Sequence, residues 1–238
     1  MYTNYIFDLY GTLVDINTNE NTKSLWEKLA LFYSFNGAYY NAKDLKSSYK
    51  KKVREMQLSI KATNYPDFPL ENIFESLFED KNIHVSIDTL KDTAEMFRIL
   101  SVKYLKLYDG VFELLDLLKQ KKKKIYLLSN AQRIFTFYEM KTLKIEEYFD
   151  GIYFSADHYM CKPDATFYNK LITQFNLDIK DSIMIGNDFI ADIAGADAIG
   201  LDSLYIDSNL SPEITSKLKS TYNIMDGDVH KIKSLIIK

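Results

Sequence analysis

A carboxylate follows the first apolar run of the chain. Tyr5-Ile6-Phe7 leads directly into Asp8, and a glycine and a hydroxyl residue, Gly11 and Thr12, come soon after it. An ionised carboxyl group at the end of a buried segment loses its hydration, so this position is costly unless the group binds a cation or takes part in a reaction. Asp8 is therefore a candidate for a nucleophile or a metal ligand.

Three further polar groups follow later in the chain. Ser129-Asn130 supplies a hydroxyl and an amide that can donate hydrogen bonds to a phosphoryl oxygen. Lys162-Pro163 places a cation before a predicted helix, whose first turn suits proline. The segment Gly186–Asp192 carries two acids, Asp188 and Asp192, four residues apart. Each group alone has a simpler explanation, as a helix N-cap or a surface charge, but their joint order favours a site.

The elements between these groups predict how they come together. Short apolar runs rich in β-branched and aromatic residues predict strands that are buried on both faces. Helical patterns separate them, and strand alternating with helix predicts an α/β fold with a doubly wound parallel sheet. Functional groups then gather beyond the carboxyl ends of the strands. The predicted strands are 5–7, 125–128, 151–154, 183–185 and 204–206, and the predicted helices are 111–122, 133–142, 165–175 and 188–198.

Residues 17–104 break this rhythm. Their patterns predict helices throughout, with no strand, and Pro66 and Pro69 mark a loop in the middle. We therefore expect residues 1–16 and 105–238 to form the α/β core. Residues 17–104 are expected to form a smaller helical insert over the carboxyl edge of the sheet.

The composition is that of an ordinary globular protein, with 47% hydrophobic and 26% charged residues. A formal net charge of -3 gives no reason to expect nucleic acid or a membrane surface as a partner. The first residues lack the pattern of a signal peptide, no apolar run is long enough to span a membrane, and Cys161 is the only cysteine. We expect a cytoplasmic protein that acts on a small molecule.

The polar groups, taken in order, resemble the four motifs of the haloacid dehalogenase-like hydrolase superfamily. Asp8–Leu13 is similar to its first motif, Ser129 to its second, Lys162-Pro163 to its third and Gly186–Asp192 to its fourth. The resemblance covers nearly the whole chain, and the insert at 17–104 has the place and helical character of the family's smaller cap domain.

The resemblance implies a covalent mechanism. Asp8 attacks an electrophilic centre and forms an aspartyl intermediate, which divides one difficult displacement into two easier ones. Ser129 and Lys162 are the other implied catalytic residues, and they complete a cradle for the anionic substrate. Thr12 and Asn130, together with Lys162, are implied as substrate-binding residues.

The resemblance also implies Mg²⁺ as the cofactor. Its ligands would be Asp8, the backbone carbonyl of Tyr10, and the acids Asp188 and Asp192. The first acid of the fourth motif usually follows the glycine directly, whereas here that position is Asn187. Either the amide oxygen of Asn187 or the carboxylate of Asp188 could face the metal.

Tyr10 departs from the phosphatases of the family, which usually carry a second aspartate at this position as general acid and base. Tyrosine here resembles the family's 2-haloacid dehalogenases, whose leaving halide needs no proton. Two features oppose that assignment. The dehalogenases resemble one another in a metal-free fourth motif, and in an arginine of the early cap that receives the halide. This chain has Asp188 and Asp192, and residues 35–43 contain no arginine, with Arg54 the nearest candidate.

We therefore predict a Mg²⁺-dependent hydrolase of small phosphomonoesters that acts through an aspartyl-phosphate on Asp8. A metal ligand at Tyr10 would be its backbone carbonyl, which any side chain leaves available. Two alternatives stay open: a 2-haloacid dehalogenase-type hydrolase, and a non-catalytic protein that only binds phosphate.

Overall fold

A parallel sheet of six strands forms the centre of the molecule. The computed structural model describes residues 2–237, and its sheet has the order β5-β4-β1-β6-β7-β8 with every pairing parallel. All the predicted strands are confirmed. The strands are β1 (Asn4–Phe7), β4 (Lys124–Ser129), β5 (Gly151–Phe154), β6 (Ser182–Gly186), β7 (Asp202–Ile206) and β8 (Tyr222–Ile224), of which only β8 was not predicted.

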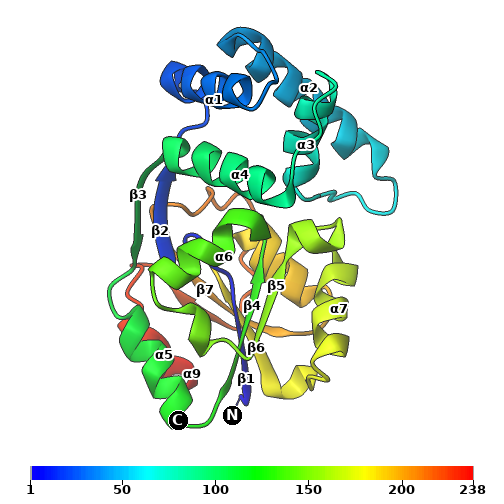
Figure 1. Cartoon of the computed structure of the whole chain (residues 1–238). Helices are drawn as coiled ribbons and strands as arrows, with labels where there is room; N and C mark the ends of the chain where they lie inside the picture. Colours follow the sequence, from blue (N-terminus) through cyan, green and yellow to red (C-terminus); the bar gives the residue numbers. More distant parts are fainter. Residues whose placement is uncertain (1, 238) are drawn as a thin grey trace.

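Helices cover both faces of this sheet (Figure 1). Side chains alternate between two hydrophobic clusters, so that Tyr5 and Phe7 face one helical layer and Ile6 faces the other. The first layer contains α5 (Val111–Gln120), α6 (Arg133–Thr142) and α9 (His230–Ile236); the second contains α7 (Ala165–Gln174) and α8 (Gly195–Asp197). The predicted doubly wound architecture is thus confirmed. Within the predicted helix 188–198, residues Phe189–Ala194 form a π-helix that leads into α8.

Four helices of the insert lie beyond the carboxyl ends of the strands, at the top of Figure 1. They are α1 (Lys23–Phe35), α2 (Ala42–Ser59), α3 (Glu71–Glu79) and α4 (Ile87–Ser101). They enclose a hydrophobic cluster of their own, rich in aromatic rings such as Trp26, Tyr33, Phe74 and Phe97. One residue of the core, Phe135 of α6, is also part of this cluster, so the insert buries some of its apolar surface against the core.

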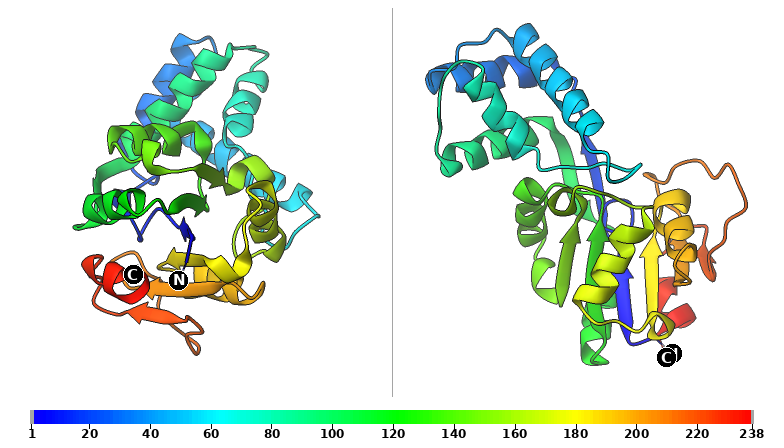
Figure 2. Two further views of the ribbon diagram at one scale, coloured as in Figure 1. Left: turned by 90° about the horizontal axis from the view of Figure 1, so that it is seen from below. Right: turned by 90° about the vertical axis from the view of Figure 1, so that its right-hand side faces the viewer.

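A two-stranded antiparallel ribbon joins the insert to the sheet. Strand β2 (Val14–Thr18) pairs with β3 (Val102–Leu107), with Val14 opposite Leu107. The prediction that residues 17–104 contain no strand was therefore wrong at both ends of the insert, and the helix predicted to reach residue 104 ends at Ser101. The two views of Figure 2 show the ribbon's position between the helical insert and the core. Among residues 2–237, no helix has the length and apolar character needed to cross a bilayer.

Candidate active site

Side chains from four strand ends line one cavity of about 160 Å³. It lies where the sheet meets the loops below the insert, because parallel strands bring their carboxyl ends to one edge. Ten of its eleven lining residues lie at or beyond the carboxyl ends of β1, β4, β6 and β7, and the other is Lys162, which lies between β5 and α7. The residues are Asp8, Tyr10, Ser129, Asn130, Lys162, Asn187, Asp188, Ala191, Asp192, Leu210 and Pro212.

Lys162 connects the first and fourth sequence motifs. Its Nζ lies 2.7 Å from Asp8 Oδ1 and 2.6 Å from Asp192 Oδ1, and its side chain is only 2% exposed. Burial alone would lower the pKa of Lys162, but the charges of Asp192 and Asp8 outweigh it and raise that pKa. Lys162 is therefore a permanent cation that holds the Asp8 carboxylate in place.

Asp192 is held by the backbone as well as by Lys162. Its Oδ2 accepts a hydrogen bond of 2.9 Å from the Asp188 N–H, so both of its oxygens have partners within the protein. Burial raises the pKa of Asp192, an effect that Lys162 only partly offsets. A Cβ on Gly186 would lie 2.2 Å from Asp192 Oδ2, so glycine is required for this close approach.

Asp188 begins the π-helix that carries Asp192. Its Oδ1 accepts hydrogen bonds from the N–H groups of Ile190 at 2.8 Å and Ala191 at 2.9 Å. This is the side-chain capping that satisfies the free N–H groups at a helix start. Asp188 therefore stabilises the start of the π-helix, and it also lines the cavity.

Asn187 packs against the loop of the first motif. Gly11 has φ +88°, and a Cβ there would lie 2.3 Å from Asn187 Nδ2, so only glycine allows the two loops to come this close. The Thr12 hydroxyl donates to Asn187 Oδ1 at 3.3 Å and is buried. Thr12 lines a different cavity, so its expected part in substrate binding stays a prediction.

The oxygen donors of the cavity suit a hard divalent cation. Asp8, Tyr10, Asn187, Asp188 and Asp192 all line it, and carboxylate, amide and carbonyl oxygens are what Mg²⁺ takes as ligands. No group of three or more His, Cys, Asp or Glu side chains within residues 2–237 is arranged to hold a metal ion. The donor set therefore fits Mg²⁺, with an amide and a backbone carbonyl supplementing the carboxylates.

Ser129 presents an unpartnered hydroxyl to this cavity. Its Oγ is buried and has no hydrogen-bond partner among the described residues, although a buried hydroxyl normally has one. Asn130 differs from it, because its side-chain amide exchanges two hydrogen bonds with the backbone of Lys162, at 2.9 and 3.0 Å. Asn130 thus positions Lys162, whereas the hydrogen-bonding capacity of the Ser129 hydroxyl is unused among the described residues.

The phenol of Tyr10 has partners outside the cavity. Its hydroxyl bonds Thr136 Oγ1 at 3.0 Å and donates to the Glu139 carboxylate, while Arg98 Nη2 donates to it at 3.3 Å. Burial, reinforced by the negative charge of Glu139, raises the pKa of Tyr10. Sequence reasoning missed these contacts, because Arg98 is 88 positions and Glu139 is 129 positions from Tyr10, and no local pattern links residues so far apart.

Two other residues of interest lie elsewhere. Arg54, the arginine nearest to the early part of the insert, is exposed on α2 and does not line the cavity. Leu210 and Pro212, from the loop after β7, do line it, and they carry no sequence signal beyond their place after a strand.

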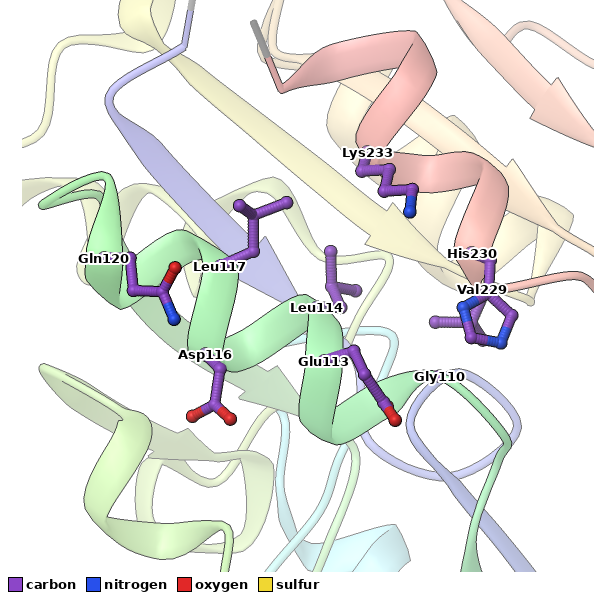
Figure 3. Close-up of a pocket in the computed structure, with 9 residues that line it drawn as sticks. All are labelled: Gly110, Glu113, Leu114, Asp116, Leu117, Gln120, Val229, His230 and Lys233. Carbon is purple, nitrogen blue, oxygen red and sulfur yellow. The ribbon is translucent and has the colours of Figure 1, made fainter.

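A second cavity, of about 350 Å³, lies between α5 and α9 (Figure 3). Its lining combines acids and bases, among them Glu113, Asp116, His230 and Lys233. It shares no residue with the cavity at the strand ends and contains none of the four motifs.

Comparisons with known proteins place the chain in a family. Residues 5–206 match the family model described as haloacid dehalogenase-like hydrolase. The chain is 25% identical over 131 residues to the HAD-hydrolase YfnB of Bacillus subtilis, a match that spans 50% of this chain and 54% of YfnB. It is 24% identical over 123 residues to a ribulose-1,5-bisphosphate 5-phosphatase of Halopiger xanaduensis, spanning 52% and 51% of the two chains. The chain thus aligns with only about half the length of these curated relatives.

Solved structures show the same fold over the full length. The magnesium-bound structure of YfnB covers 99% of this chain and 98% of its own, with a TM-score of 0.57 at 18% identity. The structure of a dehalogenase covers 100% and 98%, with a TM-score of 0.61 at 17% identity. With its matched motifs and shared fold, the chain belongs to the haloacid dehalogenase-like hydrolase family.

Proposed function

We propose that this chain is a Mg²⁺-dependent hydrolase of small phosphomonoesters that acts through an aspartyl-phosphate on Asp8. The observation that carries the proposal is the buried, unpartnered hydroxyl of Ser129, in the same cavity as the Asp8–Lys162 ion pair. A phosphoryl oxygen would accept the hydrogen bond that Ser129 lacks, while Lys162 balances its negative charge. Phosphatase names among the relatives are consistent with this chemistry.

The residues of the cavity divide the reaction between them. An oxygen of Asp8 forms a bond to phosphorus as the ester P–O bond breaks, and the alkoxide or aryloxide that leaves takes a proton from water to become the alcohol. Water then attacks the aspartyl-phosphate, which releases inorganic phosphate and restores Asp8. Lys162 holds Asp8 at 2.7 Å and reduces its repulsion with the anionic substrate. Bound Mg²⁺, held by Asp8, the Tyr10 carbonyl and Asn187 or Asp188, would neutralise charge between nucleophile and phosphate.

Tyr10 does not act as a general acid in this proposal. Its hydroxyl is occupied by Thr136 and Glu139, and its raised pKa is unsuited to proton transfer near neutral pH. The chain then gives no proton to the leaving group. Aryl phosphates, whose leaving groups need no proton, should be turned over faster than alkyl phosphates.

The helical insert would serve as the cap of the site. It lies over the carboxyl edge of the sheet (Figure 1), where a bound substrate would be enclosed between insert and core. Exclusion of water strengthens every electrostatic interaction in such a site.

A 2-haloacid dehalogenase activity is the second candidate, and Tyr10 is the residue that favours it. None of the three arginines, Arg54, Arg98 and Arg133, lines the cavity to receive a departing halide; Arg98 is paired with Glu139 and Arg133 with Asp157. A protein that only binds phosphate is the third candidate, and it would show the same cavity without turnover.

A substrate screen separates the three candidates. Purified protein is assayed with aryl and alkyl phosphates and with 2-haloacids, each with Mg²⁺ and with excess chelator. We expect phosphate release that chelator abolishes and Mg²⁺ restores, and no activity in Asp8→Asn, which is nearly isosteric and should fold normally. Halide release that is indifferent to chelator would establish the dehalogenase. Phosphate binding without turnover would establish the third candidate, and a tenth of wild-type turnover in Asp8→Asn would overturn the nucleophile.

A further inference from the structure

A network of buried polar side chains surrounds the Tyr10 hydroxyl. Tyr10 lies in the loop after β1, Arg98 on α4 of the insert, and Thr136 and Glu139 on α6 of the core. We call these four residues the Tyr10 clamp. Thr136 is fully buried and Glu139 nearly so, and a glutamate is rarely buried to this extent unless its charge is paired.

An ion pair between insert and core stabilises the clamp. Arg98 Nε lies 2.5 Å from Glu139 Oε1, and Arg98 Nη2 lies 3.3 Å from Glu139 Oε2, the two-pronged geometry of an arginine–carboxylate pair. The side chains are 13% and 10% exposed. The guanidinium also packs over the rings of Phe135, at 4.6 Å, and Tyr10, at 5.7 Å.

The clamp contacts three segments that must keep a fixed relation during catalysis. Tyr10 is two residues from Asp8, and the Gly11 N–H donates to the Val14 carbonyl, so the loop turns directly into the ribbon of the insert. Arg98 is three residues before the end of α4, where β3 of that ribbon follows. Displacement of either end would therefore move the nucleophile's loop or the insert above it.

We propose that Tyr10, Arg98 and Glu139 are positioning residues, which fix the Asp8 loop and helix α4 of the insert against helix α6. Tyrosine then occupies the family's acid/base position as an anchor for the loop. Its hydroxyl binds the ion pair and takes no part in proton transfer. The kinetic consequences of this inference rest on the proposed function, whereas the physical coupling of the segments does not.

Amide hydrogen exchange tests the coupling without any substrate. In Arg98→Lys and in Tyr10→Phe, which leave most of each side chain in place, exchange should become faster both in residues 8–14 and in residues 87–101. A matched control is Lys52→Gln, because Lys52 pairs with Asp80 at 2.9 Å entirely within the insert. The control should leave residues 8–14 unchanged. Unchanged exchange of residues 8–14 in Arg98→Lys, with native circular dichroism, would overturn the proposal.

Kinetics test the role of the clamp in the reaction. We expect kcat/KM for an aryl phosphate to fall by about ten- to a hundredfold in each variant, the cost of a small displacement of reacting groups. The losses should not add in the double variant, since both remove one network. The pH profile of kcat should keep its shape in Tyr10→Phe. If Tyr10→Phe lost the rise or the fall of kcat with pH, Tyr10 would be a general acid or base. If the losses in the double variant were additive, Tyr10 and Arg98 would act independently. Either result would refute the proposed role of the clamp. Absence of phosphatase activity in the wild type would instead refute the proposed function. The amide hydrogen exchange experiment would then still test whether the clamp couples the segments.

Discussion

Asn187 is the residue whose type most changes the expected strength of metal binding. It stands where the family usually has the first acid of the fourth motif, and its amide packs on Gly11 and accepts from the Thr12 hydroxyl. An amide oxygen can bind Mg²⁺, but it brings no negative charge. Affinity for divalent cations rises with the number of charged ligands, so this site should bind Mg²⁺ more weakly than one with a carboxylate at this position.

We predict that Asn187→Asp binds Mg²⁺ more tightly, by about tenfold, since an added charge close to a cation contributes on the order of 1.4 kcal/mol. The Thr12 hydroxyl can donate to either side chain, so the fold should be preserved. Titration calorimetry with Mg²⁺ alone measures the change. Asn223→Asp, an exposed substitution on β8, serves as the control and should leave the affinity as it is. Equal affinity of wild type and Asn187→Asp would indicate Asp188 as the ligand.

The sequence predicted which polar side chains would lie together, because the order of the motifs and the parallel sheet leave few arrangements; their roles stay a prediction. Asp8, Ser129, Lys162 and Asp192 meet at one edge, as expected for groups that follow parallel strands. The sequence did not predict the hydrogen-bond partners of these side chains. The two bonds of Asn130 to the Lys162 backbone depend on how two loops pack, which no local pattern reports.

At the level of the elements, burial decided which parts of the fold could be predicted. Strands β1, β4, β5, β6 and β7 are largely buried, so each appears as a short apolar run. The ribbon strand β3 is partly exposed along its whole length and follows α4 without a glycine or proline, so its residues continued a helical pattern. Strand β8 has three residues, too few to show any period.

Asp150 joins three of the predicted elements. It precedes β5 and accepts hydrogen bonds from Lys119 of α5 at 2.9 Å, Lys124 of β4 at 2.8 Å and the Ile125 N–H at 3.0 Å. Burial alone would raise the pKa of Asp150, but these donors together lower it to about 2. A carboxyl group with a lowered pKa stabilises the fold above its unfolded-state pKa, and this contribution is lost as the pH falls toward the folded-state value.

We therefore predict that Asp150→Asn reduces stability at pH 7 and has less effect at pH 2. The destabilisation by Asp150→Asn at pH 7 should exceed that at pH 2 by less than about 1 kcal/mol, because water screens ion pairs near the surface. Urea unfolding at a series of pH values from 7 to 2 measures it. Asp197→Asn, which removes a more exposed pair with Lys219, is the matched control and should change little. A destabilisation by Asp150→Asn that stays constant down to pH 2 would contradict the assignment.

At the scale of the whole molecule, the insert contacts the core through the ribbon, the Tyr10 clamp, the packing of Phe135 into the insert's cluster, and a strap formed by residues 63–70 between α2 and α3. The right view of Figure 2 shows this segment reaching over the core. The Cys161 N–H donates to the Tyr65 carbonyl at 2.9 Å, and the Ser155 hydroxyl donates to Asp67 at 2.5 Å. The strap thus rests on the segment that joins β5 to Lys162, so the position of the insert and the shape of the cavity are linked.

Gln132 is the residue that holds the strap most extensively, and its loss is the sharpest test of this link. Its amide donates to Asp67 Oδ1 and to the Phe68 carbonyl, both at 3.1 Å, and accepts from the Leu70 N–H at 2.9 Å. Gln132→Ala removes all three bonds and leaves the Phe68 carbonyl and the Leu70 N–H without their Gln132 partner, which should cost about 1–3 kcal/mol in urea unfolding. If the strap sets how the insert covers the substrate, KM for an aryl phosphate should rise more than kcat falls, because Asp8 and Lys162 keep their places. The exposed substitution Gln57→Ala on α2 should alter neither stability nor KM. A Gln132→Ala protein that is destabilised by this amount yet has wild-type KM would show that the strap supports the fold alone, and that the substrate is enclosed by the ribbon and the clamp.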